Sequence, residues 1–394
     1  MPLDFQQVHR QVKQLGETAV QREQHLQSLR ELARDLLSDL AADVERLNQK
    51  VRLVARVHDP TLRCALPVAD HLDARLPEPE LPPKATLLAA DGSQISPNRN
   101  AEVSYCLVNV GAIRLNLHSP ETPRTYVTSQ LFYGEQLYTE TGRITDSALA
   151  LLRDVNERST LADLARGAEP PIITFTDGPM ELWGAKEVDA ATEFHKQMDV
   201  YLEALARLCS LGVITAGYID KPAANLVVRL LEVALTPDDE LPDMKKQHPL
   251  RGVSDIDLFI SLLEPGDRSA VFGMQSKSAA NYQDELALHF FYLNVGRIGR
   301  PWIARVEIPA WVAGNQEMLE HLQAALVSQC RILGSRPYPY LLHRAHEAAM
   351  VSFLEQEQVT QMIVLELHRR GVEVGEESQK QALKKHSGRT RIKT

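Results

Sequence analysis

The sequence lacks the features that mark several classes of protein. Its four cysteines, Cys64, Cys106, Cys209 and Cys330, lie far apart and form no Cys-x-x-Cys pair, which argues against a zinc knuckle and a disulfide framework. No apolar run approaches the roughly 20 residues that a membrane helix needs, and the polar N-terminus has no apolar signal segment. We therefore expect a cytoplasmic protein with no membrane contact.

Two further absences concern phosphate ligands. The chain has no Gly-x-x-x-x-Gly-Lys-Ser/Thr loop and no convincing set of glycine-rich phosphate loops. It also lacks a net positive charge: its formal net charge is −9 at pH 7, so its surface as a whole does not attract nucleic acid. A local basic track beside a metal-neutralised acidic site remains compatible with this charge. The one strongly basic segment is the tail from Gln379 onward, and such runs are usually solvated.

The composition is that of a folded protein with several parts. The 394 residues, 44% hydrophobic and 24% charged, are enough for two or three units of ordinary size. From Leu3 to Val57, apolar residues recur at steps of three and four, which predicts an amphipathic helix broken or kinked near Gly16. Its apolar stripe could meet a dimer partner or the globular body. The proline-rich stretch 77–84 predicts a stiff connector.

The next part of the chain predicts a regular order of elements: strand, strand, strand, helix, strand, helix, strand. Three consecutive strands with short links favour an antiparallel meander. The predicted ranges are strands at 86–91, 103–113 and 125–133, a helix at 146–166, a strand at 171–177, a helix at 188–211 and a strand at 213–218. This order resembles the ribonuclease H-like topology, an α/β fold with a mixed sheet, flanking helices and catalytic carboxylates on the first strand, first helix and fourth strand.

The C-terminal half is expected to be less regular at first. Residues 236–285 are polar and predict an insertion. Residues 288–295 and 302–308 predict a hairpin with Arg297 and Arg300 at its tip, where they could touch phosphates. The pattern then predicts one helix at 316–333 and a last long helix at 341–369.

Two aspartates stand out because each follows an apolar run and precedes a glycine. They are Asp91 and Asp177. A buried strand that ends in a carboxylate, followed by a glycine that lets the chain turn, holds that carboxylate rigidly. On such strands each acid shares a face with the apolar residues two and four positions before it. Neighbouring buried carboxylates repel unless a cation lies between them, which favours a metal site; the alternative is two unrelated turn aspartates.

A third acid comes from the predicted helix at 146–166. Glu157 shares a helix face with Ala150, Leu161 and Leu164, and a glutamate among apolar residues is a candidate metal ligand. Asp154, one turn earlier on a more polar flank, is the competing choice. Either acid could instead be a solvent-facing charge, but we favour Glu157.

The last predicted helix carries a candidate histidine. His346 shares an apolar stripe with Leu342 and Ala349. A lone histidine on such a stripe is more often a core residue bonded to a carbonyl, but beside a metal it could act as a ligand or move a proton. His343, at the edge of the stripe, could bind zinc together with His346, although no further His or Cys partner supports this.

Four short motifs, in order along the chain, carry a family resemblance. They are Ala90-Asp91-Gly92-Ser93, the strand end Asp177-Gly178, Gly217-Tyr218-Ile219-Asp220-Lys221-Pro222, and Tyr338-Pro339-Tyr340 leading to Ala345-His346-Glu347. In their order and spacing the chain resembles the NurA nuclease family, from about Leu87 to Met350. No single motif is highly specific.

The resemblance implies a manganese-dependent DNA nuclease with a ribonuclease H-like core, with Mg²⁺ as the alternative ion. It places the metal ligands at Asp91, Glu157, Asp177 and His346, and a catalytic tyrosine at Tyr338 or Tyr340. It further implies a homodimer that degrades DNA from 5′ ends, cuts single strands, and processes DNA ends with the hexameric ATPase HerA.

We expect four regions: an N-terminal helical arm at 1–76, the linker at 77–84, the nuclease domain at 85–355, and a helix end with the basic tail at 356–394. Two other functions stay open. One is a non-catalytic adaptor of a DNA-translocating ATPase, which a metal-dependent nuclease assay distinguishes. The other is an actin-like nucleotide-binding protein, which absence of ATP binding in calorimetry excludes.

Overall fold

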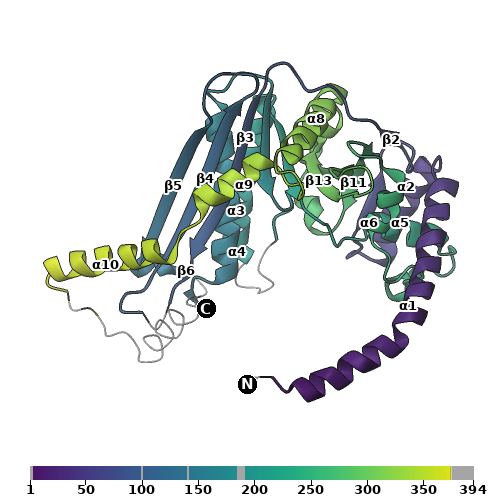
Figure 1. Ribbon diagram of the computed structural model, residues 1–394, viewed down its shortest axis with the longest axis horizontal. Coiled ribbons are helices and arrows are strands. Elements are labelled where there is room, and N and C mark those ends of the chain that lie inside the picture. Colours follow the sequence, from purple (N-terminus) through teal and green to yellow (C-terminus); the bar gives the residue numbers. More distant parts are fainter. Residues whose placement is uncertain (1–2, 99–100, 140–141, 184–190, 373, 375–394) are drawn as a thin grey trace. The chain divides into compact units, whose positions relative to one another are not determined.

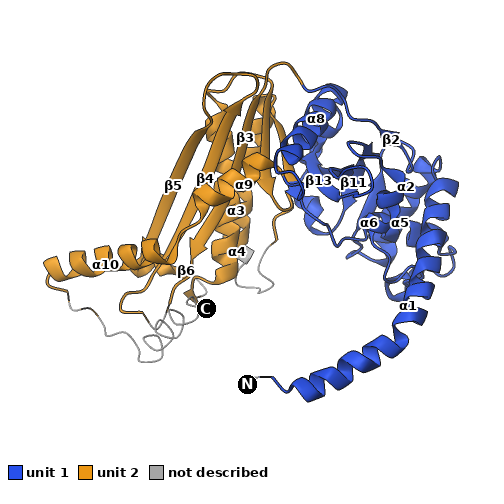
Figure 2. Cartoon of the chain, in the orientation of Figure 1, with its two compact units in different colours: residues 1–81, 218–338 blue, residues 82–217, 339–394 orange. Residues whose placement is uncertain are grey.

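The computed structural model of the chain describes residues 3–98, 101–139, 142–183, 191–372 and 374. The basic tail from Gln379 onward lies outside these residues. Figure 2 shows the two compact units, Met1–Leu81 with Tyr218–Tyr338 and Pro82–Gly217 with Pro339–Thr394. No helix in the described part of the chain is both long and apolar enough to cross a membrane.

The second unit holds the predicted meander (Figure 1). Its elements are β3 (Thr86–Ile95), β4 (Tyr105–Asn116), β5 (Arg124–Tyr133), β6 (Tyr138–Thr139), β7 (Gly142–Arg143), α3 (Asp146–Ala165), β8 (Ile172–Asp177), α4 (Ala191–Ser210), β9 (Ile214–Ile219, whose last two residues belong to the first unit), α9 (Tyr340–Ala349) and α10 (Phe353–Arg369). Strands β3, β4 and β5 pair antiparallel, β8 pairs parallel with β3, and β9 pairs with β8. The predicted ribonuclease H-like mixed sheet with flanking helices is confirmed.

Two glycines show that α9 and α3 cover opposite faces of this sheet. A Cβ on Gly111 would lie 2.4 Å from the backbone nitrogen of Ala349 in α9, and one on Gly92 would lie 2.4 Å from Cγ of Arg153 in α3. Gly111 pairs with Asp91, the residue before Gly92. Because side chains alternate along a strand, Asp91 faces α9, and Gly92 faces α3.

The apolar run of β3 is explained by burial on both faces. Leu87, Leu88, Ala89 and Ala90 are all 0% exposed. A strand between two helical layers needs no polar alternation, so a continuous apolar run is favoured there. This is why the sequence pattern identified β3 clearly.

The long C-terminal helix predicted at 341–369 is two helices. The carbonyl of Ala349, the last residue of α9, accepts hydrogen bonds from Ser93 Oγ at 2.6 Å and Asn109 Nδ2 at 2.7 Å. Ser352 then caps α10 through a capping box with Glu355. Side chains of the sheet therefore replace the next helical turn, and α10 begins anew.

The first unit contains a second group of strands. Its elements are α1 (Phe5–Asp39), α2 (Val44–Leu53), β1 (Cys64–Pro67), β2 (Arg75–Leu76), α5 (Leu226–Leu235), α6 (Asp255–Leu262), β10 (Arg268–Ser269), β11 (Phe272–Gln275), β12 (Leu288–Asn294), β13 (Ile303–Pro309), α7 (Ala310–Ala313) and α8 (Gln316–Ile332). Antiparallel pairs link β1, β11, β12 and β13 in that order, while β10 pairs with β2 and β12. The predicted hairpin is β12–β13. The stretch 236–285, expected as an insertion, supplies α6, β10 and β11.

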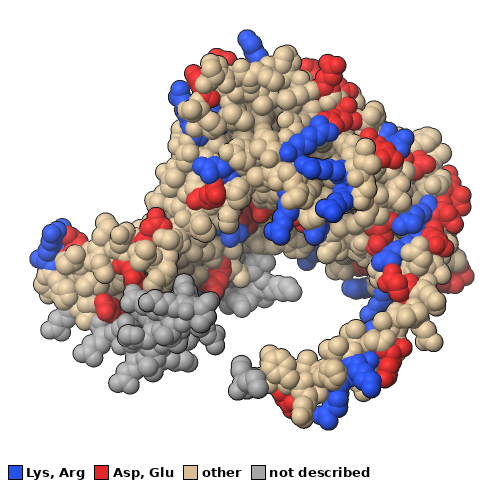
Figure 3. All heavy atoms as spheres, in the orientation of Figure 1, with Lys and Arg blue, Asp and Glu red and all other residues tan. Residues whose placement is uncertain are grey.

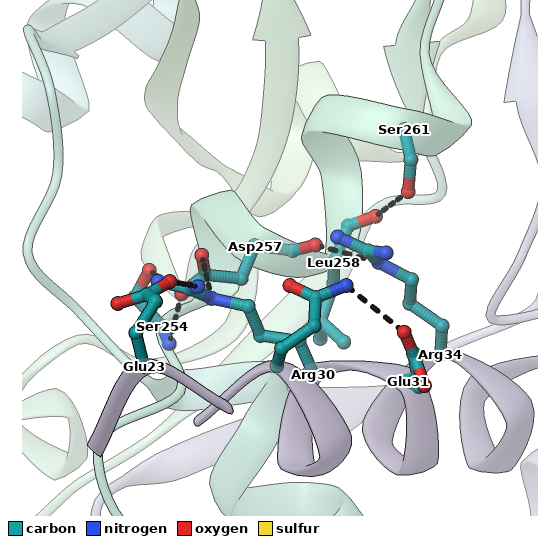
Figure 4. Close-up of polar contacts among 9 residues, drawn as sticks. Glu23, Arg30, Glu31, Arg34, Ser254, Asp257, Leu258 and Ser261 are labelled. Atoms are coloured by element: carbon teal, nitrogen blue, oxygen red, sulfur yellow. Dashed lines mark hydrogen bonds and ion pairs between the residues drawn. The ribbon is translucent and has the colours of Figure 1, made fainter. Parts of the chain in front are cut away.

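The N-terminal helix differs from its prediction in where it breaks. Helix α1 continues through Gly16 and ends at Asp39. Figure 4 shows Arg30 and Arg34 of α1 reaching α6, where Arg30 Nε lies 2.8 Å from Asp257 Oδ1 and Arg34 Nε lies 3.1 Å from the Asp257 carbonyl. The C-terminal half of α1 thus packs on the body of its own unit.

Candidate active site

Asp91 lies in the middle of β3, and the prediction that it ends a strand is wrong. The ladder to β4 continues past Asp91 as far as Ile95. Asp177, in contrast, is the last residue of β8, and Gly178 follows with a φ of +87°, a conformation that favours glycine. The same Asp-Gly pair therefore has two different structural roles.

Asp91 and Asp177 nevertheless lie at the same level of two parallel strands. The last pair between β3 and β8 is Ala90 with Thr176, so the two aspartates are the next residue on each strand. Equal register places them on the same face of the sheet. The parallel pairing thus brings these two predicted site residues to neighbouring positions.

His346 joins Asp91 from α9. Its Nδ1 lies 2.7 Å from Asp91 Oδ2, and the side chain of His346 is 63% exposed whereas that of Asp91 is 16% exposed. The hydrogen bonds that hold Ala349 fix the end of the same helix. The contact orients the imidazole and leaves most of the ring accessible to a substrate.

Glu157 approaches the same part of β3 from α3. Glu157 is 5% exposed, and burial, followed by the charges of Asp154 and Asp91, raises the pKa of Glu157 well above its usual value, against the opposing effect of Arg153. A Cβ on Gly92 would lie 2.8 Å from Glu157 Oε1. Glycine is therefore needed at position 92 for the acid to come this close.

Asp154, the competing helix acid, is held differently. Its Oδ1 accepts hydrogen bonds from Arg153 Nη2 at 2.8 Å and Nε at 3.2 Å, and its side chain is 43% exposed. Burial raises the pKa of Asp154, and the charge of Arg153 opposes this shift. Glu157 lies 3.6 Å from the same Arg153 Nε. Arg153 is thus the cation shared by both acids.

A cavity of about 250 Å³ adjoins these acids. It is lined by Arg153, Asp154, Glu157, Arg158, Thr176, Asp177, Gly178, Pro179, Leu182 and Tyr201. Arg158 is 1% exposed and donates hydrogen bonds to Thr215 Oγ1 at 2.6 Å and Thr176 Oγ1 at 2.7 Å. The sequence analysis did not single out Arg153 or Arg158, although both lie next to the proposed acids on α3.

The two tyrosine candidates lie in different surroundings. Tyr340 begins α9, six residues before His346, which corresponds to about 240° of helical rotation. Tyr338 belongs to the first unit, where its ring packs edge-on against Tyr218 with 5.8 Å between centroids. The choice between these two tyrosines stays a prediction.

The donor atoms suit a hard divalent cation, but they do not form a closed cage. Among the described residues, no three His, Cys, Asp or Glu side chains are grouped closely enough to hold an ion together. Asp91 reaches this region from the face of β3 that α9 covers, and Glu157 reaches it from α3. The fit therefore rests on donor chemistry, because carboxylate oxygens are the ligands that Mn²⁺ and Mg²⁺ prefer.

Comparison with known families decides the identity. Residues 85–351 match the family model of the NurA domain, which covers well over half of the chain. The chain belongs to the NurA family. The expected enzyme class, a phosphodiester hydrolase of the deoxyribonuclease type, is confirmed with it. No curated relative matches the chain.

Solved structures of nucleases show distant similarity to this NurA chain. The NurA nuclease from Sulfolobus solfataricus is 12% identical, with 86% of this chain and 98% of that one covered and a TM-score of 0.47. A NurA structure with manganese is 10% identical, covering 74% and 91%, with a TM-score of 0.32. The catalytic domain of human endonuclease V is 15% identical, covering 82% and 98%, with a TM-score of 0.29. The family assignment rests on the domain match.

Proposed function

We propose that this NurA chain hydrolyses DNA at a metal site formed by Asp91, Glu157 and Asp177, with His346 beside it. The observation that carries the proposal is the parallel register, which puts Asp91 and Asp177 at the same level. Glu157 adds a buried carboxylate. Its cationic neighbour Arg153, with Nε 3.6 Å from Glu157 Oε1, also pairs with Asp154. Asp154 is the alternative to Glu157.

The proposed cofactor is Mn²⁺, with Mg²⁺ as the alternative. One of the similar NurA structures contains manganese. When bound, such an ion activates water and stabilises the leaving oxygen of a phosphodiester. The oxygen donors of Asp91, Glu157 and Asp177 would hold it, and the number of ions stays open.

The chain's own groups have distinct roles in this proposal. Asp91 Oδ2 lies 2.7 Å from Nδ1 of His346, so the imidazole is oriented to complete the metal site or to move a proton. Arg153 lines the adjoining cavity and offers a cation to a phosphate, while the buried Arg158 adds positive charge at the cavity wall. Tyr338 or Tyr340 would position that phosphate.

The finer functional proposals follow from the family. We infer 5′ to 3′ exonuclease and single-strand endonuclease activity in DNA end resection and repair, together with a HerA-type hexameric ATPase. We also infer a homodimer that acts in the cytoplasm. The N-terminal half of α1 supports a partner of some kind, because Val12, Leu15 and Val20 are 59%, 62% and 67% exposed.

The direct test is digestion of labelled DNA with manganese by D91N and D177N. Each substitution keeps the shape of the side chain and removes its charge. D163N on α3 is the matched control, since Asp163 is 62% exposed and pairs only with Arg207 among the described residues. Loss of cutting by D91N and D177N, but not by D163N, supports the proposal; full activity in both site variants refutes it.

A further inference from the structure

The β12–β13 hairpin extends beyond its strands to a tight tip. The backbone nitrogen of Val295 donates to the carbonyl of Trp302 at 2.9 Å, and Arg297 and Arg300 exchange two hydrogen bonds of 3.0 and 2.8 Å. Ile298 and Gly299 alone form the turn, with Gly299 at a φ of +73°. The tip is therefore a regular two-residue hairpin turn.

This tip is held firmly. The side-chain oxygen of Asn294 accepts hydrogen bonds from the backbone nitrogens of Gly296 at 3.0 Å and Trp302 at 3.1 Å. A Cβ on Gly296 would lie 2.4 Å from the carbonyl oxygen of Arg300, so the two arms of the hairpin approach as closely as glycine permits. Such bracing fixes the direction in which the tip projects from the first unit.

Within the described part of the chain, the side chains of the tip have no structural partner that explains them. Ile298 is 93% exposed, more than any other large hydrophobic residue of the described chain. Arg297 and Arg300, on either side of the turn, are exposed, and no ion pair within the described residues involves them. An isoleucine between two unpaired arginines contributes little to folding, which points to an external ligand.

A third cation is built into the base of the hairpin. Trp302 Nε1 donates to Asp220 Oδ1 at 2.6 Å, and Lys221 Nζ lies 4.0 Å from the centre of the Trp302 ring. Lys221 has a φ of +45°, which is uncommon for a residue with a side chain and typical of functional sites. Asp220 and Lys221 of the Asp220-Lys221-Pro222 motif thus both contact Trp302 at the base of the hairpin.

We propose that the hairpin tip, residues 297–300 together with Lys221, is a contact surface for single-stranded DNA. Unpaired arginine and lysine side chains bind phosphates, and an exposed apolar side chain packs on the face of an unstacked base. This contact surface depends on the proposed nuclease function, which makes DNA the ligand. The tip belongs to the first unit, whereas the acids belong to the second.

The charge of the chain makes a local contact of this kind necessary. With a net charge of −9, and with acidic and basic side chains interspersed on the face drawn in Figure 3, DNA has to be bound by small groups of cations rather than by a basic surface. Cations that are not already paired with acids are the most effective, because no ion pair has to be broken.

The test measures binding without turnover. Fluorescence anisotropy of a labelled single strand of about 20 nucleotides is recorded in EDTA over a series of salt concentrations. We expect R297A/R300A to weaken binding roughly tenfold at ~0.1 M salt and to lower the slope of log K against log salt by about 1.4. I298S, which removes no charge, should weaken binding several-fold with the slope unchanged.

The control is R56A/R251A, which removes two exposed arginines of the same unit with no ion pair among the described residues. If R297A/R300A and I298S bind DNA as tightly as this control, the proposal is overturned and the tip serves another partner, such as a protein. Hydrolysis of bis(p-nitrophenyl) phosphate, a small diester, should be unchanged in R297A/R300A; its loss would also overturn the proposal. Failure of the wild type to hydrolyse this diester would count only against the proposed catalytic site.

Discussion

His346 Nδ1 lies 2.7 Å from Asp91 Oδ2, across 255 positions of the sequence. The contact joins α9 to β3 and depends on the close packing of α9 against β3 and its neighbour β4. Gly111 permits this, because a Cβ there would lie 2.4 Å from the Ala349 nitrogen. The pair is the best-defined element of the proposed active site, since its two side chains meet directly.

The first prediction concerns this histidine. H346A should lower kcat on DNA by about 10² to 10⁴, the range typical of a lost general acid or base, and should leave the free energy of unfolding nearly unchanged because the ring is largely exposed. His343 provides the control on the same helix: its ring is 45% exposed and lies 3.5 Å from Glu347. Equal rates for H346A and H343A would contradict a role for His346.

The second prediction concerns the space at Gly92. A methyl group there would meet Arg153 Cγ at 2.4 Å and Glu157 Oε1 at 2.8 Å, so G92A should displace the acid, reduce DNA cleavage and destabilise the fold by roughly 1 to 3 kcal/mol. G167A is the control, because nothing lies within 4 Å of a Cβ at Gly167. Urea denaturation and initial cleavage rates measure both effects. If G92A cleaves DNA at the wild-type rate, the close packing of Glu157 against position 92 is not needed for activity.

The third prediction uses the raised pKa of Glu157. A carboxyl group with a folded-state pKa above its unfolded value of about 4.5 contributes stability below that value and loses it as pH rises through the folded pKa. E157Q carries no such charge. In EDTA, the wild type should therefore lose stability relative to E157Q as pH rises from about 4 to about 8, so that the free energy of unfolding of E157Q minus that of the wild type increases.

Urea denaturation at several pH values measures this difference, with D163N as the control for an exposed acid of the same helix. If the difference in free energy of unfolding between E157Q and the wild type is constant over the whole pH range, burial does not raise the pKa of Glu157. Manganese should reduce the difference at high pH, because a bound cation offsets the buried charge.

Local patterns were enough to predict the meander of the second unit and the β12–β13 hairpin. Each depends on neighbouring strands with short links. The end of β8 was also predictable, because a glycine follows Asp177 after an apolar run. In the structure Gly178 adopts a positive φ, as a turn requires. Asp91 and Asp177 were predicted as site residues because each follows an apolar run and precedes a glycine. Their equal register on β3 and β8 could be seen only in the structure.

Other features depend on contacts that the sequence does not show. Gly92 looks like a turn residue, but it is needed for the close approach of Arg153 and Glu157. The break between α9 and α10 has no glycine or proline, although the capping box that starts at Ser352 is a local signal for it. Arg158 is buried because it bonds to Thr176 and Thr215 on two strands, a pairing visible only in the fold.

The central claim is that Asp91, Glu157 and Asp177 bind a divalent ion together, and isothermal titration of the metal-free protein with Mn²⁺ tests it most directly. The account predicts that the wild type and D163N bind with the same affinity and that D91N and D177N each bind at least about tenfold more weakly, a difference of roughly 1.4 kcal/mol. Equal affinity of all four proteins for Mn²⁺ would contradict it.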